Sequence, residues 1–202
     1  MPANKVFVLG LTGGIGCGKT EAALHLASLG ARHIDADAIS RDLTAAGGEA
    51  LPEIRRLFGD GVFLEDGQLN RRALADVVFY DAAAKRALEG VIHPLVQRRV
   101  MDVIHGEHDA LVAVLDVPLL FETGMDVLCD ACWTMSAPEG VQLERVCARD
   151  GLDEERARAR IANQMPMEAR NARADRVINT DRPIEKTRQE LTQLYQQLLK
   201  RI

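Results

Sequence analysis

Residues 13–20, with the sequence GGIGCGKT, constrain the fold of this chain more than any other stretch, because they match the pattern G-x-x-x-x-G-K-[ST]. Residues 6–12 directly before them are apolar and rich in β-branched side chains, which is typical of a buried strand. Residues 21–29 after them have a helical pattern that stops at Gly30. A strand, a glycine-rich loop and a helix in this order predict a phosphate-binding P-loop.

The residue types within this loop suit a phosphate ligand. Glycines let the backbone reach dihedrals that other residues avoid and point successive N–H groups at phosphate oxygens; they are Gly13, Gly14, Gly16 and Gly18. The following helix adds unpaired N–H groups and a positive dipole end. Lys19 supplies a charge for the β- and γ-phosphates, and the Thr20 hydroxyl can bind Mg²⁺. A glycine-rich turn without a ligand is the alternative, and the flanking strand and helix argue against it.

Composition bounds the class of protein without naming a substrate. The chain has 202 residues, enough for one domain or for one core with insertions, and its net charge of −5 gives no indication of nucleic-acid binding. The N-terminal residues lead straight into the first predicted strand, and no apolar run approaches the length of a membrane span. We therefore expect a cytoplasmic enzyme with no nucleic-acid or membrane partner, and the sequence leaves protein partners unknown.

A cytoplasmic location predicts reduced thiols for the four cysteines, which are Cys17, Cys129, Cys132 and Cys147. Cys129 and Cys132 form a C-x-x-C pair, a spacing that can bind zinc or carry redox chemistry. No second pair and no pair of histidines accompanies it, so we interpret both as small residues flanking a buried strand. Cys17 occupies a position where serine would serve as well, and we assign its thiol no chemistry.

Two carboxylates follow the second predicted strand. Residues 31–37 read as a short strand, and Asp35 and Asp37 would share one face of it if the strand continues that far. Ligands of open parallel sheets lie beyond the carboxyl ends of the strands, so we expect both acids to open toward the same crevice as the P-loop. Arg41 lies one turn after Asp37 if a helix has begun. The alternative is that either acid only caps that helix.

Residues 40–108 are mostly helical in pattern and separate the second strand from the third. Some seventy residues are too many for a simple crossover, and we interpret this insertion as a helical substrate lobe. Its basic residues by themselves indicate only an anionic partner, because such a run is usually a solvated face; they are Arg71, Arg72, Lys85, Arg86, Arg98 and Arg99. His93 lies within the apolar periodic stretch, where a histidine is more often a core residue than a catalyst.

Three further strands complete the predicted sheet. An apolar run ends in Asp116, as in a Walker-B element, and this carboxylate could hold Mg²⁺ opposite Thr20. Residues 132–137 and 176–179 read as the fourth and fifth strands, and residues 183–202 as a closing amphipathic helix. The predicted fold class is therefore α/β, with a parallel five-stranded sheet flanked by helices.

An arginine-rich segment lies between the last two strands. Residues 141–176 contain eight arginines and no lysine, in a chain with 20 arginines and 5 lysines. Four of the arginines lie close to one helical stripe and could close over phosphates as a lid; they are Arg145, Arg149, Arg156 and Arg160. Acidic residues lie among them and could instead form ordinary surface pairs. Composition alone leaves both interpretations open.

A P-loop allows a kinase, an NTPase motor or a GTPase switch. The sequence has no N-K-x-D for guanine and no D-x-x-G to sense a γ-phosphate, and 202 residues are few for a motor. A small-metabolite kinase fits best, because phosphoryl transfer asks mainly for alignment and charge neutralisation. The alternatives are another small-molecule kinase of the shikimate or adenylate kinase sort, and a nucleotide-binding regulator without phosphotransfer.

Several motifs, in order from residue 6 to about 180, resemble the dephospho-CoA kinase family. GLTGGIGCGKT at 10–20 resembles the opening of that family, and IDAD at 34–37 with Arg41 resembles its D-A-D…R element. LNR at 69–71, IHP at 92–94 and VPLLFE at 117–122 are similar to further family motifs. So are RIANQ at 160–164 and ADRVIN at 174–179. The P-loop alone is generic, whereas these motifs together are specific.

The resemblance implies ATP-dependent phosphorylation, with Mg²⁺, of the ribose 3′-hydroxyl of dephospho-CoA, which is the last step of coenzyme A synthesis. It also implies a single P-loop kinase domain with a helical substrate-binding insertion and an arginine-rich lid. The nucleotide-binding core would comprise residues 1–39, 110–140 and 174–202. The helical CoA-binding lobe would comprise residues 40–109, and the lid residues 141–173.

The resemblance further implies roles for single residues. Asp37 would activate the 3′-hydroxyl, Arg145 and Arg149 would contact phosphates from the lid, and Asn179 would lie near the adenine. The expected catalytic residues are Asp37, Lys19, Asp35 and Arg145. The expected ATP-binding residues are Gly14, Ile15, Gly16, Cys17, Gly18, Lys19, Thr20, Glu21, Arg149 and Asn179. Expected to bind the acceptor are Asp37, Arg41, Arg71 and His93, and expected to bind the metal are Thr20 and Asp116.

Two positions depart from the family pattern. Cys17 stands where serine is usual, and Glu21 stands where serine or threonine is common. Neither change touches the phosphate-binding backbone. Glu21, however, adds a negative charge beside the expected nucleotide, so we expect the affinity for the nucleotide to differ.

Overall fold

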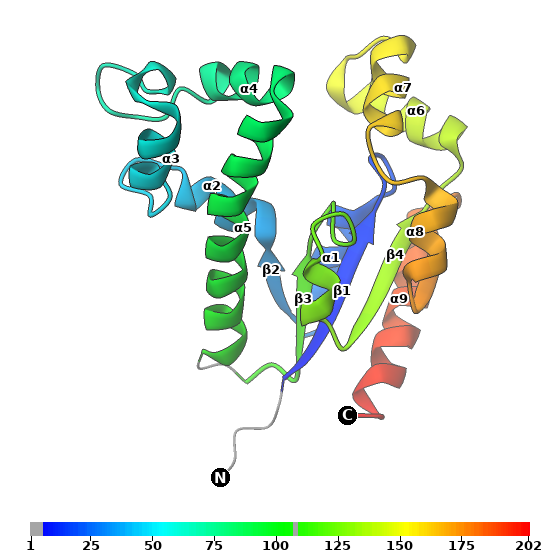
Figure 1. The fold of residues 1–202 in the computed structure, drawn as a ribbon. Helices are drawn as coiled ribbons and strands as arrows, with labels where there is room; N and C mark the ends of the chain where they lie inside the picture. The colour runs from blue at the N-terminus through cyan, green and yellow to red at the C-terminus, as the bar shows by residue number, and fades with distance from the viewer. Residues whose placement is uncertain (1–5, 107–108) are drawn as a thin grey trace. The chain divides into compact units, whose positions relative to one another are not determined.

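A computed structural model describes residues 6–106 and 109–202 (Figure 1). The chain divides into two compact units. One unit contains the chain up to Ile34 and again from Ile104 onward, and the other contains Asp35–Val103. Each unit is described by itself below.

The first unit is built on a five-stranded sheet. Its strands are β1 (Phe7–Gly13), β2 (Arg32–Asp35), β3 (Val112–Asp116), β4 (Ala131–Ser136) and β5 (Arg176–Asn179), in the order β2-β3-β1-β4-β5. β1 pairs in parallel with both β3 and β4, and β4 pairs in parallel with β5. The predicted parallel five-stranded sheet is confirmed. Because β1 is central, the loop at its carboxyl end lies between the ends of β3 and β4.

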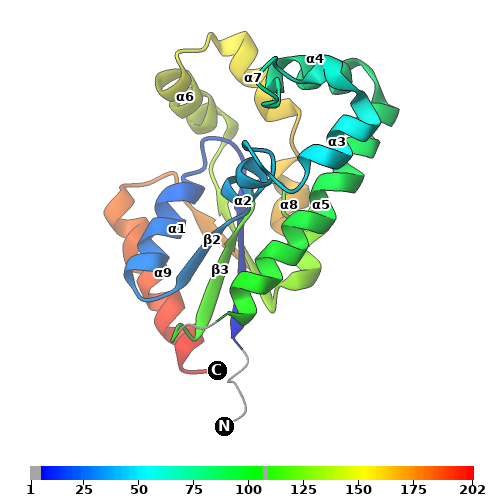
Figure 2. The ribbon, with the colours of Figure 1, turned by 90° about the vertical axis from the view of Figure 1, so that its left-hand side faces the viewer.

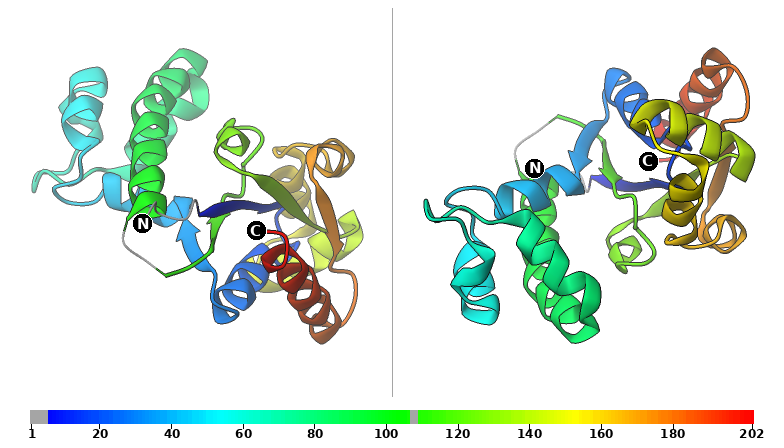
Figure 3. Two further views of the ribbon diagram at one scale, coloured as in Figure 1. Left: turned by 90° about the horizontal axis from the view of Figure 1, so that it is seen from below. Right: turned by 90° about the horizontal axis from the view of Figure 1, so that it is seen from above.

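Helices cover both faces of this sheet. Figures 2 and 3 show α1 (Lys19–Ser28) and α9 (Ile184–Leu199) together on one face and α8 (Met167–Arg173) on the other. The core between the sheet, α1 and α9 includes fully buried aliphatic side chains, among them Leu9, Leu11, Leu26, Val112, Val114 and Leu191. The predicted strand–loop–helix order around residues 13–20 is confirmed, because β1 ends at Gly13 and α1 begins at Lys19.

The arginine-rich segment forms two helices before α8. These are α6 (Glu139–Asp150) and α7 (Glu154–Ala162), and Gly151 with φ 64° ends the first of them. The predicted single stripe of arginines is therefore wrong: Arg145 and Arg149 lie on α6, and Arg156 and Arg160 lie on α7. The sequence spacing suited one helix, but a glycine in the left-handed region interrupts it.

The second unit is helical, as its periodicity predicts. It contains α2 (Ala36–Leu43), α3 (Leu51–Phe58), the short 3₁₀ helix η1 (Asp60–Val62), α4 (Arg71–Tyr80) and most of α5 (Ala82–His105). Asp35 and Asn70 begin α2 and α4, each accepting a hydrogen bond from a backbone N–H of the first turn. None of the helices within the described parts of the chain is long and apolar enough to span a membrane.

The packing of α9 yields a prediction about stability. Leu191 of α9 is 1% exposed within the sheet–helix core, whereas Leu24 of α1 is 54% exposed. We expect Leu191→Ala to lower the free energy of unfolding by about 2–5 kcal/mol, because it leaves a cavity. The matched change Leu24→Ala should alter it by about 0.5 kcal/mol or less. Urea unfolding followed by circular dichroism measures both, and equal effects would contradict this account of the core.

Candidate functional site

The loop between β1 and α1 has the backbone that phosphate binding requires. Gly16 and Gly18 have φ of 78° and 75°, in the left-handed region, and Gly18 is the residue before the first turn of α1. Within the loop, the Cys17 N–H donates to the Gly14 carbonyl at 3.0 Å. Burial raises the pKa of the Cys17 thiol, and this keeps the thiol protonated, in line with our assigning it no chemistry.

Gly13 and Gly14 serve the loop in another way, because their φ angles are not positive. A Cβ on Gly13 would lie 2.8 Å from the Met135 carbonyl oxygen of β4. A Cβ on Gly14 would lie 2.9 Å from Oε1 of Gln142 on α6. The prediction that all four glycines supply unusual dihedrals is therefore wrong for these two, which instead let β4 and α6 pack closely behind the loop.

Lys19 and Asp116 meet at the start of α1. The Lys19 ammonium forms an ion pair with Oδ1 of Asp116, and Nε2 of His33 lies 3.1 Å from Oδ2 of the same carboxylate. Asp116 is 4% exposed and ends β3, and the strand register sets it beside Leu11 of β1. His33, on β2, is a partner of this carboxylate that the sequence did not indicate.

These residues fit a magnesium ion by the chemistry of their donors. Asp116 offers a buried carboxylate, and Thr20 offers a hydroxyl in the exposed first turn of α1. Mg²⁺ prefers oxygen ligands and is usually bound by one or two protein groups together with substrate phosphates. No group of three or more His, Cys, Asp or Glu side chains that could hold a metal occurs among the described residues.

Arg145, one of the four arginines predicted to form a lid, contacts the loop. Its guanidinium donates to the Gly16 carbonyl at 3.2 Å, and to the carbonyl and hydroxyl of Thr180, just after β5, at 2.7 and 3.3 Å. These acceptors are neutral, so the hydrogen bonds orient the side chain without cancelling its charge. Arg145 therefore points its charge at the phosphate loop.

The other three predicted lid arginines pair with acids in this structure. Arg149 and Arg160 both contact Asp150, at 2.7 and 2.9 Å, and Arg156 contacts Asp153 at 3.3 Å. The hydrogen bond from Arg149 lowers the pKa of Asp150. The surface-pair alternative thus describes these three side chains, and the phosphate contact expected of Arg149 stays a prediction.

A pocket of ≈ 280 Å³ adjoins the loop on the α9 side. It is lined by Gly18, Glu21, Ala22, Arg145, Thr180, Arg182, Ile184, Thr187, Arg188 and Leu191. Glu21 pairs with Arg188 at 3.1 Å across the chain, so its negative charge beside the pocket has a cationic partner. Sequence reasoning missed Arg182 and Arg188, since a contact between residues 167 positions apart leaves no local pattern. Asn179 does not line this pocket, and its Oδ1 accepts the Asp181 N–H at 2.8 Å.

Asp35 ends β2 and caps α2, and Asp37 lies in the first turn of α2; both belong to the second unit. Asp35 ends the strand, accepts the Ala38 N–H at 2.9 Å and lies 3.5 Å from Arg41. Asp37 is exposed in the first turn of the helix. The predicted shared strand face is therefore wrong, because helix formation begins at Ala36. The expectation that both acids open toward the P-loop concerns residues of two units and stays a prediction.

Other predicted acceptor residues also lie in the second unit. Arg71 donates to the carbonyls of Arg41 and Thr44, at 3.2 and 3.3 Å, and so joins the start of α4 to the end of α2. His93 is half-buried in the middle of α5. Arg71 thus holds two helices together, whatever else it binds.

The loop geometry generates a matched pair of glycine substitutions. Gly16→Ala and Gly18→Ala both place a Cβ at positive φ, which costs about 1–2 kcal/mol. Only at Gly16 would the Cβ also meet backbone, 2.9 Å from the Gln142 carbonyl oxygen; at Gly18 nothing lies within 4 Å. We expect Gly16→Ala to lower the ligand-free unfolding free energy clearly more than Gly18→Ala does. Thermal unfolding tests this, and equal losses would contradict the close packing of α6 on the loop.

Comparison with known proteins relates this geometry to a family. A family model described as dephospho-CoA kinase matches residues 7–186. The dephospho-CoA kinase of Moorella thermoacetica is 43% identical over 197 residues, covering 96% of this chain and 92% of that protein.

Solved structures agree with this relationship. The dephospho-CoA kinase from Campylobacter jejuni superposes with a TM-score of 0.71 at 27% identity, covering 95% of this chain and 96% of that one. The crystal structure of TT1252 from Thermus thermophilus gives a TM-score of 0.83 at 35% identity, with 96% and 98% of the two chains covered. The chain with this glycine loop, Lys19–Asp116 pair and anchored Arg145 belongs to the dephospho-CoA kinase family.

Proposed function

We propose that this chain transfers the γ-phosphoryl group of ATP to the ribose 3′-hydroxyl of dephospho-CoA, giving CoA and ADP in the final step of coenzyme A biosynthesis. The observation that carries the proposal is the glycine loop with Lys19 at the start of α1, where it pairs with Asp116, and with Arg145 bonded to the Gly16 carbonyl, in a chain whose family match runs over residues 7–186. In the reaction the bond between the γ-phosphorus and the bridging oxygen breaks, and a bond to the 3′-oxygen forms.

The loop binds the phosphates of ATP in this proposal. Its N–H groups and the first turn of α1 contact phosphate oxygens, and the positive end of the α1 dipole favours their charge. Lys19 exchanges Asp116 for the β- and γ-phosphates, where it neutralises charge that grows during transfer. Arg145 reaches the same phosphates and keeps its bonds to neutral carbonyls.

We assign the pocket between α1, α6 and α9 to the nucleoside part of ATP. It borders Gly18 and Glu21 at the start of α1, so it adjoins the place where the phosphates would bind. The pair between Glu21 and Arg188 removes the charge conflict that Glu21 alone would create. Asn179 remains a proposed neighbour of the adenine.

We propose Thr20 and Asp116 as the groups that hold Mg²⁺ with the ATP phosphates. When bound, this ion would supply positive charge that offsets the charge of the phosphates. His33 contacts the second oxygen of Asp116 and keeps that carboxylate hydrogen-bonded when Lys19 leaves it.

The second unit supplies the acceptor site in this proposal. Asp37 accepts the proton of the 3′-hydroxyl as the oxygen attacks, and Asp35 supports the metal or its water shell. Arg41, Arg71 and His93 bind the acceptor. The proposed division is a nucleotide-binding core of residues 1–39, 110–140 and 174–202, a CoA-binding lobe of 40–109 and a lid of 141–173.

The roles of the two acids can be separated. Asp37→Asn should lower kcat by about 10²-fold or more with little change in ADP affinity, because the lost interaction is made mainly in the transition state. Asp35→Asn retains a good helix cap and should instead raise the Mg²⁺ concentration needed for half-maximal rate. Asp42→Asn, exposed on the same helix, is the control. Exchanged phenotypes would exchange the roles, and two neutral variants would remove both acids from the site.

The reaction itself is tested with a panel of acceptors. We expect ADP release with dephospho-CoA, a product heavier by one phosphoryl group, and no turnover of the 3′-deoxy analogue or of shikimate. Adenosine and AMP should be poorer acceptors. Lys19→Ala should fold and lose about 10²-fold or more in kcat. Turnover of AMP or shikimate at the rate of dephospho-CoA would overturn the assignment.

A further inference from the structure

The phosphate loop is held from outside by the end of α7. The Ile15 N–H donates to Oε1 of Gln164 at 2.8 Å, although the two residues are 149 positions apart. Gln164 directly follows Asn163, which is the C-cap residue of α7. This contact lies within one unit of the chain and connects the lid segment directly with the loop backbone.

The side chain of Ile15 is held by the same helices. Leu143 and Val146 of α6 and Ala157 of α7 form a small buried cluster, and Ile15 packs against it. Arg145 of α6 contacts the carbonyl of the next residue, Gly16. Three separate contacts with α6 and the α7 end therefore converge on two neighbouring residues of the loop.

Gln164 is itself fixed by the backbone on either side of it. Its own N–H donates to the Ile161 carbonyl at 3.1 Å, and the N–H of Met165 donates to Oε1 of Glu122 at 3.1 Å. The buried Arg170 donates to the Met165 carbonyl at 2.8 Å. These bonds fix the backbone that carries Gln164, and with it the place from which the side chain reaches the Ile15 N–H.

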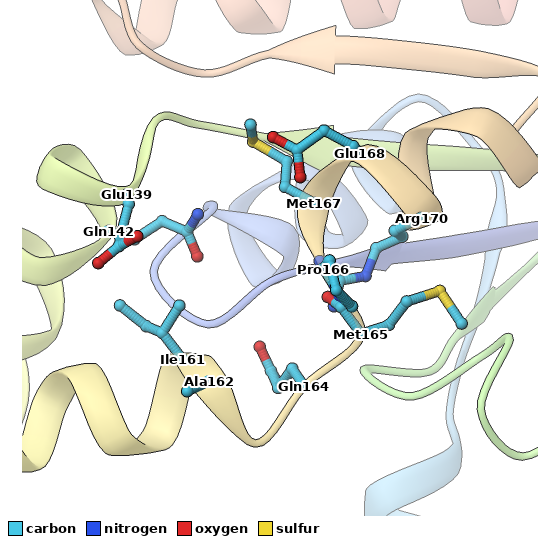
Figure 4. A pocket seen from close by; sticks show the side chains of 10 residues that line it. All are labelled: Glu139, Gln142, Ile161, Ala162, Gln164, Met165, Pro166, Met167, Glu168 and Arg170. Carbon is cyan, nitrogen blue, oxygen red and sulfur yellow. The ribbon is translucent and has the colours of Figure 1, made fainter.

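Gln164 is held by hydrogen bonds more than by dense packing. Figure 4 shows it beside a pocket of ≈ 260 Å³ whose lining also includes Gln142, Met165 and Arg170. Because this space is open, a side chain of equal size without an acceptor can be accommodated there. Such a replacement isolates the hydrogen bond to Ile15 from the packing around it.

We propose that Gln164 is a positioning residue for phosphate transfer. By occupying the Ile15 N–H it holds the first part of the loop turned toward the lid. The phosphates are then left to the later N–H groups of the loop, apart from that of Cys17, which donates to the Gly14 carbonyl. Gln164 also makes the position of the loop depend on α7. The proposal rests on the proposed nucleotide site, and its primary readouts do not require turnover.

The first experiment observes the contact in the unmodified protein. A scalar coupling across the hydrogen bond, between the Ile15 amide nitrogen and the Gln164 side-chain carbonyl carbon, should be detectable by NMR in the deuterated protein. Its presence supports the proposal without any variant. A fast-exchanging Ile15 amide with no coupling would overturn it.

The second experiment removes the acceptor. Gln164→Met keeps the length of the side chain but leaves the Ile15 donor unpaired, so we expect faster exchange of that amide. Because the loop is then no longer held in place, we expect the Kd for ADP to rise about tenfold. Gln164→Glu keeps an acceptor and should retain the slow exchange. Gln193→Met, exposed on α9, is the matched control and should match the wild type in both measurements.

Kinetics distinguish positioning from a merely structural effect. For Gln164→Met we expect KM for ATP to rise while KM for dephospho-CoA stays within about twofold of the wild type. Equal rises in both, or an unchanged Kd for ADP, would reduce Gln164 to a structural contact. Dephospho-CoA that is not phosphorylated by the wild type would instead refute the proposed function, while the NMR result and ADP affinity would still decide the role of Gln164.

Discussion

The close packing of β4 and α6 against the outer side of the phosphate loop is the constraint on which the site depends. A loop with several glycines would be mobile by itself, because glycine loses the most conformational entropy on folding. Here Met135 and Gln142 lie closer than van der Waals contact to the places where side chains would begin at Gly13 and Gly14. Because Gly13 and Gly14 have no side chains, the protein can pack closely behind the loop, and the front of the loop remains open to a ligand.

Charge compensation around the loop follows a second constraint. A buried carboxylate such as Asp116 is costly unless it is paired and hydrogen-bonded. Lys19 and His33 share this task by contacting different oxygens of the carboxylate. Lys19 can therefore turn to a phosphate while His33 keeps one oxygen of Asp116 hydrogen-bonded. Because Asp116 has two partners, the loss of Lys19 would not leave the buried carboxylate without a hydrogen bond.

The sequence predicted the elements well where local pattern determines them. The five strands, the loop and α9 follow from apolar runs and glycines, and β5 was placed at its observed bounds. Two local features were misjudged. The strand ends at Asp35, whose side chain caps a helix that begins at Ala36. Asp37 therefore lies on the helix and does not share a strand face with Asp35. Gly151 divides the arginine stripe, because one glycine in the left-handed region ends α6.

Contacts between distant residues set the limit of sequence reasoning at the site. The roles of Gly13 and Gly14 depend on which atoms of β4 and α6 come to lie behind them, and no spacing within the loop encodes that. Glu21 pairs with Arg188 on the last helix, and no local pattern predicts that contact. In the sequence, Gln164 is only the last position of the motif RIANQ at 160–164. Its partner is a backbone N–H, which leaves no side-chain signature at Ile15.

The arginines of α6 and α7 differ in what a phosphate would have to displace. Arg149, Arg156 and Arg160 each contact an acid of the same segment, and ion pairs near the surface contribute little to stability. A phosphate can therefore replace these acids at small cost, provided the helix brings the arginine close enough. The described hydrogen bonds of Arg145 go to carbonyls and a hydroxyl, so a phosphate would not have to displace an acid from them. Its charge is already oriented, and neutral acceptors leave it available. Among these four arginines, preorganisation therefore favours Arg145 for the charge that develops on the transferred phosphoryl group.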